Sequence, residues 1–184
     1  LVMHIPAYYP SRLPEIFDRL GTLPASHPID GETIRPGHIY IGLPDHHLQL
    51  EEGSIRITQG PKENRHRPAI DLLFRTAAYS YGSRVVGVIL TGALYDGTAG
   101  LKVVKQHGGI AIVQDPAEAL FTSMPMSAIE HVDVDYVVPL SKMGSLLIHL
   151  AGPMEEEQMK APSVFSNSLT KEAPGHCGLF KEEA

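Results

Sequence analysis

The sequence predicts an α/β fold in which a doubly wound, mostly parallel sheet carries helices on both faces and a β-hairpin is inserted. Short, almost continuous apolar runs at residues 85–90 and 110–114 alternate with segments of helical spacing. That alternation is typical of parallel strands buried on both faces. Around Glu52 and Gly53, two segments of alternating polarity flank a tight turn, which indicates the hairpin.

The individual elements follow from the spacing of apolar residues. Helices are predicted at residues 11–20, 68–80, 98–107, 127–131 and 142–150. Strands are predicted at residues 1–3, 38–43, 47–50, 55–58, 85–90, 110–114 and 136–138. Pro68 suits a helix N-terminus, and Gly108 suits the end of the helix that precedes it.

Composition limits the class of protein. The chain has 184 residues, 43% hydrophobic and 20% charged, as in a globular domain. Its net charge of −6 argues against nucleic-acid partners, and no apolar run is long enough for direct membrane insertion. A single cysteine, Cys177, cannot form an internal disulfide, which predicts a reducing, cytoplasmic setting.

Two boundaries are expected. Residues 1–151 form one domain, whereas residues 152–184 have few apolar side chains, scattered prolines and acidic clusters, which predicts a disordered tail. The first residue, Leu1, is not an initiator, and the opening residues resemble the end of a strand followed by a loop. We therefore expect the domain to be truncated at its N-terminus.

The loop after residues 85–90 is the first candidate site. It holds Gly92, Asp96, Gly97 and Gly100, and ligands in open α/β sheets bind at the carboxyl ends of strands. Asp96 could instead be an ordinary N-cap of the following helix. A phosphate-binding loop fits less well, because the spacing matches neither known phosphate motif and Asp96 would repel phosphate.

His4 is the candidate partner of Asp96. Both residues follow predicted strands, so a parallel sheet would bring them to one edge, where Asp96 could orient His4 as a general base. His4 could also be a polar residue without a catalytic role. Such a pair activates a nucleophile, and none is evident: Cys177 lies in the predicted tail, and Ser123 is the best local candidate.

Other polar clusters give weaker predictions. His46 and His47 are adjacent on a strand and point to opposite faces, so no metal site is predicted. Arg65, His66 and Arg67 form a small basic patch in NRHRP, which is either a solvated loop or a contact for an acidic substrate segment.

Several motifs occur in an order that resembles the catalytic domain of CheB-type chemotaxis methylesterases. They are VMHIP, PGHIYIGLPDHHL, NRHRPAIDLLF, GVILTGALYDGTAGL, GGIAIVQDPAEALFTSMPMSAI and DYVVPL, and they span residues 1 to about 150. The resemblance implies the doubly wound fold with its hairpin. It also implies hydrolysis of glutamate γ-methyl esters on methyl-accepting chemotaxis receptors, with deamidation of receptor glutamines in some members, and no cofactor.

The resemblance further implies a serine–histidine–aspartate triad. The family histidine falls on His4 and the family aspartate on Asp96, while the oxyanion-binding backbone falls near Gly92 and Ala93. Ala93 replaces the family methionine, and Ser123 replaces a glycine found in many members. The family serine belongs to a loop before the histidine that this chain does not contain, so the chain alone is expected to be nearly inactive.

Three functions remain open from sequence. The first is a methylesterase domain that needs an upstream serine. The second is a non-catalytic receptor-binding module that has lost its nucleophile. The third is a different serine hydrolase or amidase on the same scaffold.

Overall fold

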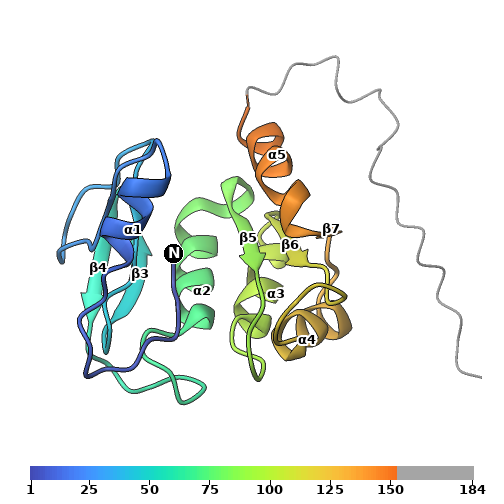
Figure 1. The fold of residues 1–184 in the computed structure, drawn as a ribbon, viewed down its shortest axis with the longest axis horizontal. Helices are drawn as coiled ribbons and strands as arrows, with labels where there is room; N and C mark the ends of the chain where they lie inside the picture. The colour runs from blue at the N-terminus through green and yellow to red at the C-terminus, as the bar shows by residue number, and fades with distance from the viewer. Residues whose placement is uncertain (153–184) are drawn as a thin grey trace, which may run out of the picture. The chain divides into compact units, whose positions relative to one another are not determined.

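The computed structural model describes residues 1–152, and its elements are labelled in Figure 1. The helices are α1 (Leu13–Leu20), α2 (Ile70–Tyr81), α3 (Thr98–Gln106), α4 (Ser123–His131) and α5 (Leu140–Ala151), with a 3-10 turn η1 (Gly82–Arg84). The strands are β1 (Ala25–Ser26), β2 (Ile39–Tyr40), β3 (His47–Glu51), β4 (Ser54–Thr58), β5 (Val86–Ile89), β6 (Ile110–Gln114) and β7 (Tyr136–Val138). The predicted tail, from residue 153 on, and Cys177 lie outside the described residues.

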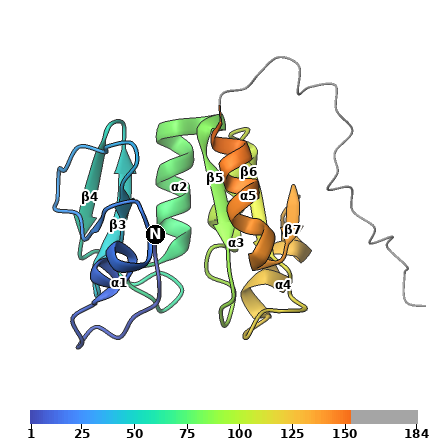
Figure 2. The ribbon, with the colours of Figure 1, turned by 45° about the horizontal axis from the view of Figure 1, so that its top comes forward.

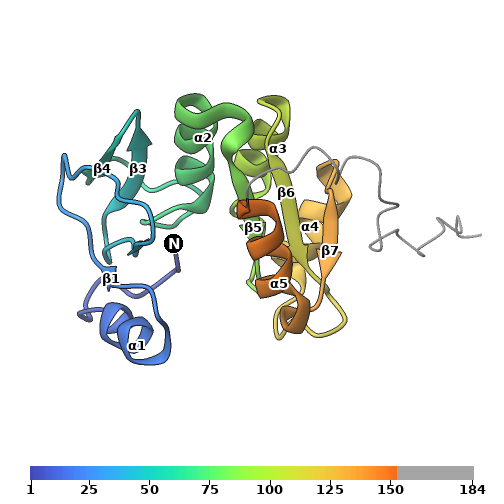
Figure 3. The same cartoon turned by 90° about the horizontal axis from the view of Figure 1, so that it is seen from above.

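The sheet β5-β6-β7 is parallel and is covered on both faces. Alternate residues of β6 point to opposite sides, so Ala111 and Val113 pack in one apolar cluster with α3 and α4, whereas Ile112 packs in a second cluster. That second cluster contains Met143 and Leu146 of α5. Figures 2 and 3 show α5 on one face of this sheet and α3 on the other. The predicted doubly wound arrangement is confirmed.

The expected continuous sheet is divided into separate pieces within residues 1–152. Strands β1 and β2 form a short parallel pair, and Leu1 bonds to the backbone of Tyr40 and Gly42, but residues 1–3 do not form the predicted strand. These bonds join Leu1 N to Tyr40 O at 2.6 Å and Gly42 N to Leu1 O at 2.8 Å. No described strand pairs with the second edge of β5, so the strand pairing does not join residues 1–4 to the sheet β5-β6-β7.

The predicted hairpin is confirmed as β3-β4, with Leu50 opposite Ile55. It packs against α2, because the backbone of Leu50 bonds to the hydroxyls of Thr76 and Ser80 on that helix. Helix α2 therefore lies between the hairpin and β5 (Figure 1).

Helix α4 begins earlier than the apolar spacing predicted. It starts at Ser123 rather than at residue 127 and includes Pro125 in its first turn. Proline is tolerated there because the first N–H groups of a helix have no partner within the helix.

Candidate active site

The structure brings His4 and Asp96 together at the carboxyl end of β5. His4 Nε2 lies 2.7 Å from Asp96 Oδ2. The Asp96 side chain is fully buried, while that of His4 is 22% exposed. No bond to Nδ1 of His4 forms within residues 1–152, so Nδ1 is the ring nitrogen left for proton transfer.

Asp96 caps a helix, but not the helix that follows it. Its carboxylate accepts hydrogen bonds from the backbone N–H of Ile70 at 2.7 Å and of Asp71 at 3.2 Å, at the start of α2. The N-cap of α3 is Gly97, whose φ of 96° is a left-handed conformation and whose cap has no side-chain bond. The sequence suggested that Asp96 could be a helix N-cap. Asp96 does cap a helix, but the helix is α2 and not α3, which follows it.

The bonds to Asp96 keep it ionised. Burial alone would raise its pKa, but hydrogen bonds from His4, Ile70, Asn64 and Asp71 outweigh burial and hold the pKa below its ordinary value. An ionised, fully bonded carboxylate can fix the orientation of the His4 ring and stabilise it when it gains a proton.

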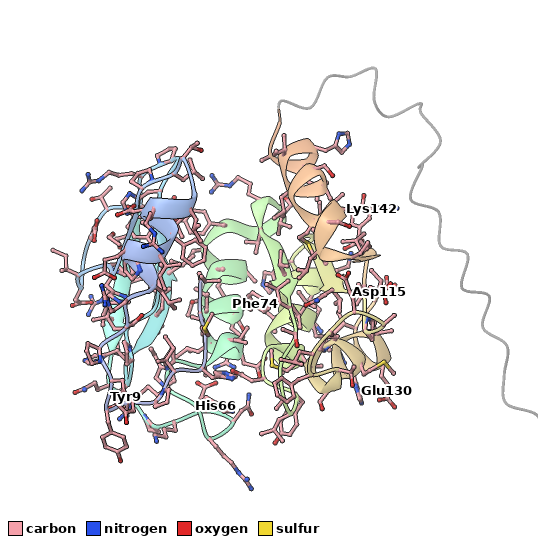
Figure 4. All side chains as sticks on the ribbon, in the orientation of Figure 1. Tyr9, His66, Phe74, Asp115, Glu130 and Lys142 are labelled. Atoms are coloured by element: carbon pink, nitrogen blue, oxygen red, sulfur yellow. The ribbon has the colours of Figure 1, made fainter. Side chains whose placement is uncertain are left out.

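A second histidine, His66, stacks on His4. The two ring centroids are 3.6 Å apart and the rings are nearly parallel, at 8°. His66 Nε2 is buried and has no hydrogen-bond partner in the described part of the chain. Burial, followed by the neighbouring His4, lowers the pKa of His66, which favours its neutral form. Figure 4 shows His66 near the end of α2 at which that helix begins, below Phe74.

Beside His4 lies a cavity of about 760 Å³. It extends from the segment around His4 to the edge of β5 and is lined by apolar side chains including Leu73, Phe74, Val86 and Val88. A second cavity of about 500 Å³ shares Leu1, Leu73, Phe74 and Val86 with the first. Both cavities therefore follow the edge of β5 that has no partner strand among the described residues.

The loop that lines the larger cavity contains both predicted oxyanion positions, Gly92 and Ala93. The N–H of Gly92 donates to Phe121 O at 3.0 Å, and Met124 N donates back to Gly92 O at 3.0 Å. The N–H of Ala93 bonds to no described residue. Of the two predicted oxyanion positions, Ala93 is thus the one with a free donor. Leu94 follows with φ 66°, an uncommon conformation for a bulky residue.

The structure does not bring the other predicted residues to His4. Arg67 binds Asp45 at 2.8 Å and the carbonyl of Gly60 at 2.7 Å, whereas the Arg65 side chain is exposed. Ser123 is exposed at the start of α4 and does not line the cavity with His4. His46 and His47 bond to the backbone oxygens of Pro44 and Pro61, respectively. Among described residues, no three His, Cys, Asp or Glu side chains group as for a metal.

Sequence reasoning missed the polar residues around Asp96. Asn64 donates to Asp96 Oδ1 at 2.9 Å, and Asp71 lies beside it in the first turn of α2. The segment NRHRP, predicted as a basic patch, contains both Asn64, which binds Asp96, and His66, which stacks on His4.

None of the helices among residues 1–152 has the length and apolar character needed to cross a bilayer.

Comparison with known proteins identifies relatives that cover most of this chain. The CheB methylesterase family model matches residues 1–147. The crystal structure of the Thermotoga maritima CheB methylesterase catalytic domain superposes with a TM-score of 0.76 at 36% identity, covering 81% of each chain. A Leptospira interrogans relative is 40% identical over 151 residues, which are 82% of this chain and 78% of the relative. A Ralstonia nicotianae protein-glutamate methylesterase/protein-glutamine glutaminase is 38% identical over 78% of this chain, which spans only 39% of that protein.

Proposed function

Because the chain belongs to the CheB methylesterase family, we propose that it acts in hydrolysis of glutamate γ-methyl esters on methyl-accepting chemotaxis receptors in the cytoplasm. Deamidation of receptor glutamines is a second proposed reaction, supported by the name of the Ralstonia relative. In this proposal His4 is the general base and Asp96 is the carboxylate that orients it. The observation that carries the proposal is the 2.7 Å bond between His4 Nε2 and the buried Asp96.

The proposed nucleophile is a serine outside the described residues. Thr91 is the hydroxyl side chain that lines the cavity with His4, and its Oγ1 already donates to Phe121 O. We place the serine on a strand that precedes Leu1 in the encoded protein and occupies the apolar cavity beside β5. The open edge of β5 and the cavity of about 760 Å³ support that placement.

The proposed reaction is a two-step acyl transfer. His4 Nδ1 takes the serine proton as the serine oxygen attacks the ester carbonyl, and the N–H of Ala93 stabilises the oxyanion. The tetrahedral intermediate collapses, His4 returns the proton to the methoxy group, and methanol leaves. Water activated by His4 then attacks the acyl-serine, which releases the glutamate side chain and restores the serine. Arg65, whose side chain is exposed and which precedes His66 in the sequence, is a proposed contact for acidic receptor segments. Arg67 could make the same contact only by breaking its ion pair with Asp45 and binding a receptor carboxylate instead.

The test uses the protein translated from the coding sequence with whatever precedes Leu1, called here the encoded protein. We expect the encoded protein to release methanol from methylated receptor, and His4→Ala to lower the rate about 1,000-fold or more. His149→Ala, an exposed histidine on α5, is the matched control and should leave the rate unchanged. An encoded protein that releases no methanol would exclude this function, and release that persists in His4→Ala would exclude His4 as the general base.

The second candidate, a binding module without catalysis, is favoured by the lack of a free hydroxyl beside His4 in residues 1–152. It predicts that the encoded protein binds methylated receptor and releases no methanol. The third candidate, a different amidase, predicts turnover of glutamine peptides without turnover of methyl esters.

The open edge of β5 gives a separate prediction for the 184-residue chain on its own. The edge of β5 that no described strand covers lies beside two apolar cavities, and such an edge is a template for association. We therefore expect this chain to form soluble aggregates or oligomers in light scattering after size-exclusion chromatography. A monodisperse monomer with a cooperative thermal transition would contradict this prediction.

A further inference from the structure

Asp71 is a buried carboxylate that the proposed reaction does not use. It lies in the first turn of α2, its exposed fraction is 4%, and both carboxylate oxygens are bonded. Oδ1 accepts from the backbone N–H of Gly100 in α3 at 2.6 Å, and Oδ2 accepts from Asn64 Nδ2 at 2.7 Å. Asp71 thus connects the start of one helix to the start of another.

Asn64 bridges Asp71 and Asp96 with a single amide group. The same Nδ2 that binds Asp71 lies 2.9 Å from Asp96 Oδ1. An amide NH₂ has two hydrogens, so each carboxylate receives one. The two buried carboxylates would otherwise repel each other, and the shared amide offsets that repulsion.

The bridge also determines which oxygen of Asp96 faces His4. Asn64 and the backbone N–H of Asp71 occupy Oδ1, so Oδ2 is directed to His4 and to Ile70 N. Each carboxylate binds the helix to which it does not belong. Asp96 precedes α3 and caps α2, whereas Asp71 belongs to α2 and binds α3. The position of Asp96 is therefore fixed by both helices.

We propose that Asn64 and Asp71 are positioning residues that hold Asp96 Oδ2 against His4 and keep His4 in the tautomer protonated at Nε2. This inference rests on the proposed function for its kinetic consequence, but the tautomer of His4 can be measured without turnover.

The test removes the amide without straining the backbone. Asn64 has a φ of 49°, so Asn64→Gly keeps the left-handed conformation and deletes only the bridge. In the encoded protein we expect kcat to fall about 10- to 100-fold with KM nearly unchanged, as for loss of a bond to a buried charge. We also expect ¹H–¹⁵N spectra of His4 to change from the Nε2–H tautomer to a mixture. Lys62→Gly, exposed in the same loop, is the control for loop flexibility and should change neither readout.

A double variant separates positioning from general destabilisation. If the amide acts by offsetting repulsion between the carboxylates, Asp71→Asn added to Asn64→Gly should raise kcat several-fold above that of Asn64→Gly alone. A purely structural role would instead make the double variant the less active of the two.

The results distinguish the inference from the function on which it rests. An active encoded protein whose Asn64→Gly variant keeps both kcat and the His4 tautomer overturns the inference. An inactive encoded protein overturns the proposed function, and the His4 tautomer in Asn64→Gly then decides the positioning role by itself.

Discussion

Replacing Asp96 with asparagine is expected to lower kcat of the encoded protein about 10,000-fold, because the amide cannot orient His4 as the carboxylate does. The same change should destabilise the fold. Asp96 accepts bonds from two side chains and two backbone N–H groups, and an asparagine would turn its NH₂ toward some of these donors. A buried donor without an acceptor costs about 1–3 kcal/mol, which urea unfolding would measure.

Asp115→Asn is the matched control for this experiment. Asp115 also follows a strand, β6, and is labelled in Figure 4, but it caps only its own loop through Ala117 N at 2.9 Å. We expect Asp115→Asn to retain activity and nearly all stability. Asp96→Asn with full activity would show that Asp96 does not orient the base.

The stability difference between Asp96 and asparagine should depend on pH. The pKa of Asp96 is lower in the folded protein than its ordinary value of 3.8, so ionisation of Asp96 favours folding. That contribution is present in full above the ordinary pKa and is lost as pH falls through the lowered one. The difference in unfolding free energy should therefore be constant near neutral pH and shrink below about pH 4.

The second large effect is expected for Gly100→Ala, which should separate α2 from α3. A Cβ at Gly100 would lie 2.7 Å from both Asp71 O and Phe74 Cβ, and 2.8 Å from Asp71 Cα. Backbone atoms cannot move aside as a flexible side chain can, so one helix must shift. We expect the unfolding free energy of the encoded protein to fall by about 3 kcal/mol, at the upper end for overpacking.

Gly144→Ala is the control for the substitution itself. Gly144 lies within α5, and no atom is within 4 Å of the position that a Cβ would occupy. Alanine there should stabilise the helix by about 0.5–1 kcal/mol. If Gly100→Ala and Gly144→Ala changed the unfolding free energy equally, the close contact of α2 and α3 would not be the reason that Gly100 must be a glycine.

The sequence predicted best those features that depend on local periodicity. Residues 110–114 and 136–138 were predicted as strands with the bounds observed for β6 and β7, because apolar runs of that length between turns have few alternatives. The sequence also made a pair of His4 and Asp96 plausible, but on the premise that both follow strands of one sheet, and residues 1–3 form no strand in the structure.

The polar network around Asp96 was beyond prediction because it depends on how helices pack. Asp71 has the sequence signature of a first-turn acidic residue, and nothing local says that it binds Gly100 of another helix. Similarly, the choice of Ala93 over Gly92 as the free donor depends on Phe121, about thirty residues away on a different loop.

The cavity of about 760 Å³ beside β5 has a consequence for how the proposed activity would begin. His4 and Asp96 are already bonded at 2.7 Å while this cavity is empty of any described residue. Under the proposed function, assembly would not have to form the His4–Asp96 pair and would only have to bring a serine hydroxyl to it. A peptide carrying that hydroxyl, supplied as a separate chain, should thus turn on hydrolysis at a rate limited by strand docking. The enzyme would then consist of two separate chains, and the larger one would already hold His4 and Asp96 in their bonded arrangement.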